Sequence, residues 1–262
     1  MAALARLELE RLLQERRLGP TVWTAPSETV VISTAPTDCE RLDEELDGGW
    51  PRGQVSEIVA PLSAGASWLA CQSLAAATRR GELGAWLDPL DQFDPESAAS
   101  AQFVWSSLLW VRGDARAVEQ AGHVSSREQQ RFWGCLLERS IKALALILQA
   151  EGFGVVVLDW LAVPPLFIKQ LPWTTWRRVQ RLVEGRETAC LVLQSEALAR
   201  SAGGVTLLLK SASPGARWEG RRFVGLTGQA RVIRAAWQST TQQGFELGGE
   251  EARAGNAERL AI

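Results

Sequence analysis

The sequence contains no tyrosine, only one histidine, and no pair of cysteines at the close spacing that is typical of zinc ligands. The scattered cysteines predict buried, reduced thiols and no metal site. The single histidine, His123, has no evident metal or nucleophile partner, and we interpret it as a loop residue. The four cysteines are Cys39, Cys71, Cys135 and Cys190.

Long apolar runs are absent as well, because none approaches the roughly 20 residues that span a bilayer. Residues 1–17 mix acidic and basic side chains and, unlike a signal peptide, contain no continuous apolar core. These two absences predict a cytoplasmic protein without a membrane partner. Of the 262 residues, 46% are hydrophobic, which is enough for one large domain with a proper core.

The net charge of −2 is unevenly distributed along the chain. Residues 169–240 contain 12 lysines and arginines against 4 acidic residues, which gives this stretch a net charge of +8. Such an asymmetry indicates a basic face for nucleic acid or for an acidic partner, or ion pairing with the acidic remainder of the chain. The sequence leaves these alternatives open.

Short apolar runs alternate with helix-like stretches between residues 54 and 194, which predicts an α/β fold: a mainly parallel sheet with helices on both faces. Residues 204–237 resemble a run of antiparallel strands at the C-terminal end. Ligands bind beyond the carboxyl ends of parallel strands, so we expect ligand-binding residues at one edge of the sheet. That edge would carry Ala60–Ser67, Asp88, Asp159 and Gln194.

We predict three segments along the chain. Residues 1–35 would form a helix and a strand that lead into the core, and residues 36–240 would form the core itself. Residues 241–262 are rich in glycine and glutamate, which predicts a mobile tail.

The stretch APLSAGASW, residues 60–68, occupies the place of a phosphate-binding loop between an apolar run and a helix-like stretch. An intact loop reads G-x-x-x-x-G-K-[ST], and its backbone N–H groups and lysine bind phosphates. Here the defining positions hold Ala60, Gly65, Ala66 and Ser67, so the first glycine and the lysine are missing. Loss of the lysine alone weakens nucleotide binding by about 10- to 150-fold. We therefore expect weak or no binding of ATP and Mg²⁺, and no other cofactor.

Taken together, the pieces between about residues 28 and 210 resemble, in order, the core of the RecA family of recombination ATPases. They are the loop with its lead-in GGWPRGQVSEIV, then LGAWLDPLDQFDPESAASA, VVVLDW and LVLQS. The resemblance implies a RecA-like core of the P-loop NTPase type. It also implies that Asp159 matches the Walker B acid and that Gln194 matches the glutamine that senses nucleotide.

The same resemblance places the catalytic glutamate of RecA two residues after Asp88, where this chain has Leu90. Leucine cannot accept a proton, and the neighbouring Asp91 is one residue out of place. With lysine and glutamate both missing, we expect a pseudo-ATPase in which Asp159 caps a strand end. The alternative is a divergent ATPase that uses Ser67, Asp159 and Asp91.

One branch of the RecA-like proteins matches more closely. The stretches GGWPRG, WLDPLDQFDPESAA and LLWVRG are similar to the ImuA family. This resemblance implies an accessory role in SOS-induced, error-prone translesion DNA synthesis. The implied partners are ImuB, which is an inactive relative of Y-family polymerases, together with RecA and an error-prone replicative-type polymerase. A cell-division inhibitor of the SulA type is a weaker alternative, because SulA proteins are shorter and lack the extended lead-in.

Arginines and tryptophans are interleaved in the basic region, for example around Trp173 and Trp176. This pattern suits single-stranded DNA, or it forms a solvated face above buried tryptophans. Only about ten residues separate Gln194 from the next apolar run, too few for the DNA-binding loop of RecA. The N-terminal segment resembles RecA elements that pass to a neighbouring subunit, which is compatible with an oligomer. The candidate DNA or partner surface comprises Arg177, Arg178, Arg181, Arg217, Arg221, Arg222, Arg231 and Arg234.

Overall fold

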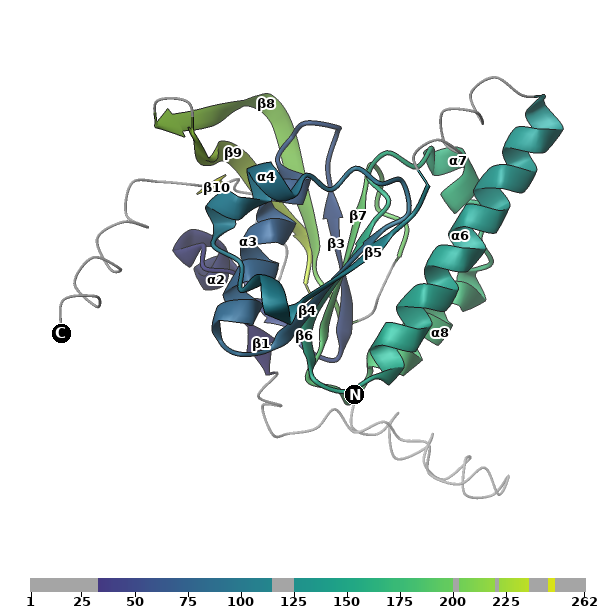
Figure 1. Ribbon diagram of the computed structural model, residues 1–262, viewed down its shortest axis with the longest axis horizontal. Helices are drawn as coiled ribbons and strands as arrows, with labels where there is room; N and C mark the ends of the chain where they lie inside the picture. Colours follow the sequence, from purple (N-terminus) through teal and green to yellow (C-terminus); the bar gives the residue numbers. More distant parts are fainter. Residues whose placement is uncertain (1–32, 115–124, 200–202, 220–221, 236–244, 248–262) are drawn as a thin grey trace, which may run out of the picture. The chain divides into compact units, whose positions relative to one another are not determined.

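A sheet of eight strands organises the part of the chain that the computed structural model describes, which is residues 33–114, 125–199, 203–219, 222–235 and 245–247 (Figure 1). These residues all belong to one unit, Ser33–Ile262. The strand order is β10-β9-β8-β3-β7-β6-β4-β5. The bounds are β3 (Gln54–Val59), β4 (Leu83–Asp88), β5 (Leu108–Arg112), β6 (Phe153–Asp159), β7 (Ala189–Gln194), β8 (Thr206–Glu219), β9 (Arg222–Arg234) and β10 (Phe245–Leu247).

The strands from β8 to β5 pair in parallel, whereas β9 and β10 add to the β8 edge in antiparallel orientation. A separate two-stranded sheet joins β1 (Thr34–Ala35) to β2 (Trp50–Pro51). The predicted α/β class, with antiparallel strands at the C-terminal end, is therefore confirmed.

Helices cover both faces of the sheet (Figure 1). One layer contains α2 (Glu40–Glu45), α3 (Ala66–Arg79) and α4 (Pro95–Ala98), followed by the short turns η1 (Ala99–Ala101) and η2 (Trp105–Ser107). The other layer contains α6 (Ser126–Gln149), α7 (Pro165–Ile168) and α8 (Trp173–Val183). The central strands β4, β6 and β7 are buried on both faces between the layers, which explains why almost all of their residues are apolar.

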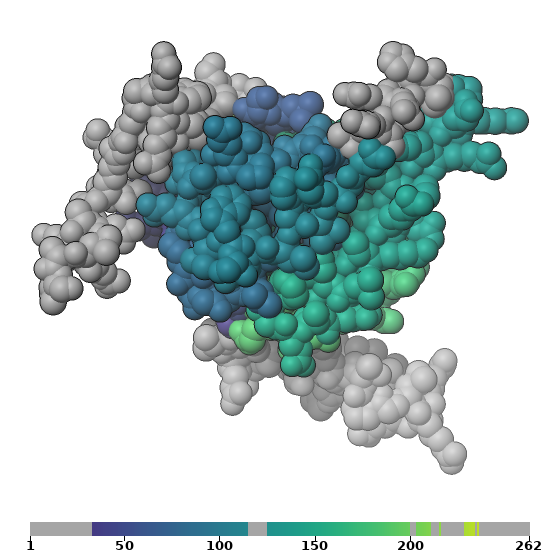
Figure 2. Space-filling view, in the orientation of Figure 1, coloured from purple at the N-terminus to yellow at the C-terminus, as the bar shows by residue number. Residues whose placement is uncertain are grey.

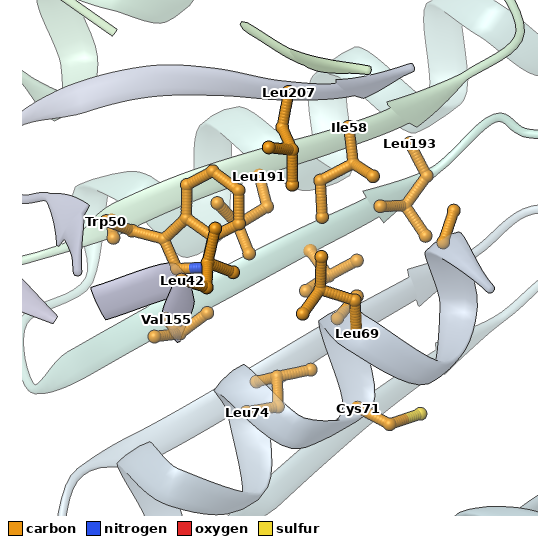
Figure 3. Close-up of a cluster of buried hydrophobic side chains, with 14 of the residues drawn as sticks. Leu42, Trp50, Ile58, Leu69, Cys71, Leu74, Val155, Leu191, Leu193 and Leu207 are labelled. Carbon is orange, nitrogen blue, oxygen red and sulfur yellow. The ribbon is translucent and has the colours of Figure 1, made fainter. Parts of the chain in front are cut away.

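Successive residues of the central strands belong to two different hydrophobic clusters. On β7, Leu191 and Leu193 face the cluster under α3, whereas Cys190 and Val192 face the cluster under α6 and α8. This alternation follows from the two-residue period of a strand. Figure 3 shows the first cluster, in which side chains from α2, α3 and the strands meet.

The structure differs from the predicted segments at both ends of the core. Within the predicted lead-in, Thr34–Ala35 pairs with β2 and so belongs to the core unit. Within the predicted tail, Phe245–Leu247 pairs with β9. Residues 1–32 and 248–262 lie outside the described residues, as does His123.

Candidate functional site at the carboxyl edge of the sheet

Four neighbouring parallel strands bring the predicted site residues to one edge of the sheet. The order β3-β7-β6-β4 places the loop that begins at Ala60 next to Gln194, then Asp159, then Asp88. The first two strands are joined at this edge by the Ala60 N–H, which donates to the Gln194 carbonyl at 3.0 Å.

The loop between β3 and α3 keeps the backbone turn of a phosphate-binding loop. The Ala64 N–H donates to the Pro61 carbonyl at 3.2 Å, and Gly65 is the N-cap of α3 with a φ of +94°. That left-handed conformation favours glycine. Ala66, at the lysine position, is buried in the core, and Ser67 is only half-buried. The loop therefore presents a helix N-terminus but no cation.

Three N–H groups donate hydrogen bonds to the carboxylate of Asp88. Its carboxylate accepts the backbone N–H groups of Gln92 at 2.8 Å and Phe93 at 2.9 Å, and the indole N–H of Trp110 at 3.3 Å. The side chain is almost completely buried. These bonds make Asp88 the cap of the turn that follows β4.

Leu90 and Asp91, which the resemblance to RecA places at and beside the position of the catalytic glutamate, have different surroundings. Leu90 is buried in the cluster under α6. Asp91 forms two hydrogen bonds to the Arg112 guanidinium, at 2.7 and 3.0 Å, and this interaction lowers the pKa of the Asp91 carboxyl. A carboxylate that is held in this way is a weak base.

Asp159 ends β6 as a buried carboxyl with a shifted pKa. Burial raises its pKa, the Leu161 N–H, which donates to Oδ1 at 3.1 Å, opposes the shift, and the charge of Asp88 adds to it, so that the resulting pKa is about 7. A carboxyl with this pKa is only partly ionised near neutral pH.

The side-chain amide of Gln194 is hydrogen-bonded to another side chain of the sheet. It is completely buried, and its amide N–H donates to Oε1 of Glu57 on β3. The same carboxylate accepts the backbone N–H groups of Leu198 at 2.7 Å and Ala199, and its Oε2 accepts the Thr206 hydroxyl at 3.0 Å. Glu57 thus joins three neighbouring strands and the segment that follows β7.

Glu57 is the residue of this site that the sequence interpretation missed. Its signal is an acidic residue inside the apolar run VSEIV, which the parallel pattern predicts to be buried on both faces. A carboxylate in such a strand must be paired, because an isolated buried charge is far too costly. The run was interpreted only as the strand before the loop.

The structure separates the eight candidate arginines into two groups. Arg177, Arg178 and Arg181 are exposed on α8, which lies against α6 and β3. Arg231 is half-buried on β9, two strands beyond β3. Arg217, Arg222 and Arg234 belong to β8 and β9, and Arg221 lies outside the described residues. Among the arginine side chains that the structure describes, the three on α8 and Arg231 on β9 thus lie on different elements.

A cavity of about 480 Å³ lies between the ends of β4 and β5 and the middle of α6. Asp88, Arg112 and Arg139 line it, and the loop from Ala60 to Ser67 does not. Figure 2 shows α6, in teal to green, beside the blue to teal residues of this region. The cavity is thus separate from the phosphate-binding loop.

The described part of the chain contains no cluster of three or more potential metal-ligating side chains, and none of its helices has the length and apolarity needed to cross a bilayer. No disulfide joins the four cysteines. Cys71 and Cys190 are buried as predicted, whereas Cys135 is exposed on α6.

Comparison with known proteins relates the chain to RecA. RecA of Prochlorococcus marinus strain MIT 9303 is 39% identical over 83 residues, which are 32% of this chain and 22% of that protein. RecA of Cutibacterium acnes is 33% identical over 107 residues, which are 40% of this chain and 31% of that protein. RecA of Synechococcus sp. strain WH7803 is 38% identical over 83 residues, 32% and 22% of the two chains.

The chain thus spans less than a third of the length of these curated relatives. No protein-family model matches it. The identities, together with the parallel sheet and its helices on both faces, support a RecA-like relationship and a RecA-like core.

Proposed function

We propose that this chain is a RecA-related DNA-repair protein that acts by binding and does not hydrolyse ATP. One observation carries the proposal: the position of the catalytic glutamate is occupied by Leu90, which is buried in the core. The buried Ala66 at the lysine position and the Arg112-bound Asp91 support it. Without a cation and a general base, a RecA-like site lacks the groups that stabilise and start phosphoryl transfer.

The narrower proposal is an accessory protein of SOS-induced translesion synthesis, of the ImuA type. Its support is the resemblance of GGWPRG, WLDPLDQFDPESAA and LLWVRG to that family. The proposed partners are ImuB, RecA and an error-prone replicative-type polymerase. The protein would act in the cytoplasm.

Two measurements test these proposals separately. Phosphate release from ATP and Mg²⁺ should stay at background, with intact RecA as the positive control. Release above background that Asp159→Ala abolishes would overturn the first proposal. An affinity capture with ImuB should retain the chain, and a failure under conditions that retain a known ImuB partner would overturn the second.

A nucleotide-binding role without hydrolysis is the alternative, and one observation favours it. The side-chain oxygen of Gln194 is buried beside the loop and has no hydrogen-bond partner among the described residues. Calorimetric titration with ATP and Mg²⁺ up to millimolar concentration tests this role. Micromolar binding would support a nucleotide-gated switch, whereas the absence of heat would leave only partner binding.

A further inference from the structure

The cavity beside α6 has walls of apolar side chains from three elements of the fold. Those that line it from β4, β5 and α6 are Leu87, Val111, Phe132, Leu136 and Ala143. Its volume of about 480 Å³ lies within the range of roughly 300–1,000 Å³ that is typical of small-molecule sites. A ligand in this cavity would remove apolar surface from water, which favours binding. The walls therefore suit a small molecule with an apolar body.

A close backbone contact forms one wall of the cavity. The Gly113 N–H donates to the Asp88 carbonyl at 2.7 Å, and a Cβ atom at Gly113 would lie only 1.9 Å from the Pro89 carbonyl oxygen. The segments that follow β4 and β5 therefore touch through their backbones, which only glycine permits at position 113. This wall is formed without a ligand, as is usual for small-molecule sites.

Several polar side chains that line the cavity use their polar groups within the chain. The Asp88 carboxylate accepts the three N–H groups described above, and the Ser140 hydroxyl donates to the Leu136 carbonyl at 2.7 Å. Asp114 likewise interacts with another group of the chain. These side chains need no ligand to satisfy them.

Two guanidinium groups at the cavity have N–H groups to offer a ligand. Asp91 engages Nε and Nη2 of Arg112, and the guanidinium carbon lies 4.3 Å from the centroid of the Trp110 ring, so this side chain is oriented while its Nη1 lies outside the pair. Arg139 is exposed on α6 and forms no ion pair with the residues that the structure describes. A guanidinium group binds carboxylates and phosphates through charge-assisted hydrogen bonds.

We infer that this cavity binds a small amphipathic anion. An aliphatic body would lie against the apolar walls, and a carboxylate or phosphate group would contact Arg112 and Arg139. One ligand of this class satisfies both features of the cavity, whereas a neutral apolar molecule leaves the guanidinium groups unused. The inference does not depend on the function proposed above, because the cavity is separate from the phosphate-binding loop.

Calorimetric titration of the full chain with octanoate, octyl phosphate and octanol, each up to millimolar concentration, tests the class of ligand. The two anions should bind at one site per chain and about 10-fold more tightly than octanol, since only they form charge-assisted hydrogen bonds. The tighter of the two anions identifies the preferred head group as a carboxylate or a phosphate.

Two substitutions separate the charged and apolar parts of the cavity. Arg139→Ala should weaken binding of the anions about 10-fold and leave octanol unaffected. Ala143→Phe should fill the cavity and abolish binding of all three ligands. The matched control is Lys142→Ala, which removes a cation of the same helix that does not line the cavity and should leave the affinities unchanged. Circular dichroism of each variant checks that the fold persists.

The thiol of Cys135 reports where the ligand binds. It lines the cavity and is exposed, whereas Cys71 and Cys190 are buried. Bound octanoate should slow the alkylation of Cys135 by iodoacetamide, a neutral reagent, as measured by mass spectrometry of the peptide that contains this residue. In Ala143→Phe, octanoate should have no effect on the rate.

Three outcomes would overturn the inference. The first is the absence of saturable octanoate binding, and the second is an affinity for octanol equal to that for the anions. The third is protection of Cys135 that appears on raising the protein concentration without any ligand, which would show that the cavity receives a second copy of the chain.

Discussion

The carboxyl edge of the sheet and the outer face of α8 use their charged groups in opposite ways. At the sheet edge, Asp88 and Glu57 accept several hydrogen bonds each, all from groups of the same chain. On α8, Arg177 and Arg181 have no such partners in the described structure. Internal pairing stabilises a fold, whereas unpaired charge at the surface is available for association.

The contrast shows that a residue can match a functional position of a relative and still have a structural environment. Asp159 and Gln194 match functional positions of RecA, yet burial and internal bonds have given them structural surroundings. Substitutions at the sheet edge should change the unfolding free energy strongly, whereas substitutions on the outer face of α8 should change it little.

The largest effect is expected at Glu57. Glu57→Ala leaves the donors of Gln194, Leu198 and Thr206 without their acceptor, and we expect a loss of about 5 kcal/mol of unfolding free energy. Urea denaturation measures it. Glu138→Ala, which removes an exposed carboxylate, should produce no measurable change. Equal effects of the two substitutions would refute the structural role of Glu57.

A second effect concerns the pH dependence that Asp159 confers. Because its folded pKa, about 7, lies above the ordinary aspartate value of 3.8, its protonated form stabilises the fold at low pH. That stability disappears as the pH rises through 7, which amounts to about 3 kcal/mol between pH 5 and pH 8. Asp159→Asn should flatten the dependence by this amount in urea unfolding at the two pH values. An unchanged slope would show that burial does not perturb this carboxyl.

A third substitution places a glutamate at position 90, where the resemblance to RecA predicts the catalytic glutamate. Leu90→Glu places a carboxylate in the cluster under α6 without a partner, so we expect about 2–3 kcal/mol of destabilisation and no ATPase activity. Leu166→Glu, at an exposed leucine, is the control and should have little effect. A gain of ATP hydrolysis in Leu90→Glu would contradict the proposed loss of catalysis.

The smallest effect is expected on α8. Arg178→Ala should change the unfolding free energy by less than about 0.5 kcal/mol, since the side chain is exposed and makes no ion pair in the described structure. Thermal unfolding checks this value. A large destabilisation would mean that the arginine supports the fold, which would weaken the comparison with the sheet edge.

The elements with a clear hydrophobic period could be predicted from the sequence. The long helix expected near residues 127–150 is observed at Ser126–Gln149, where Ser125 and Glu128 form a capping box. The last strands could be expected as an antiparallel run but not delimited, because β9 continues through GLTG and pairs with β8 with register shifts that no local pattern indicates. Helix α7, which begins at the second proline of the pair Pro164–Pro165, was missed because prolines usually interrupt a helix.

The site was predictable in position but only partly in chemistry. Strand order and parallel pairing bring Ala60, Asp159 and Gln194 to the same edge, as the alternation of strands and helices indicated. The side-chain partner of Gln194, in contrast, comes from a segment more than 100 residues away, namely Glu57 on β3. No local pattern encodes such contacts, so the pairing of Gln194 could not be derived from its own surroundings in the sequence.

The position of β3 also has a consequence for the order of folding during synthesis. This strand pairs only with β7 and β8 within the sheet, at residues such as Cys190 and Leu207. The ribosome adds both partners more than 130 residues later, while β4, β5 and β6 are already complete. Until then Val55–Val59 keeps two open edges, which are templates for pairing with other chains. Stalling before residue 189 would therefore yield a nascent chain that is prone to aggregate through β3.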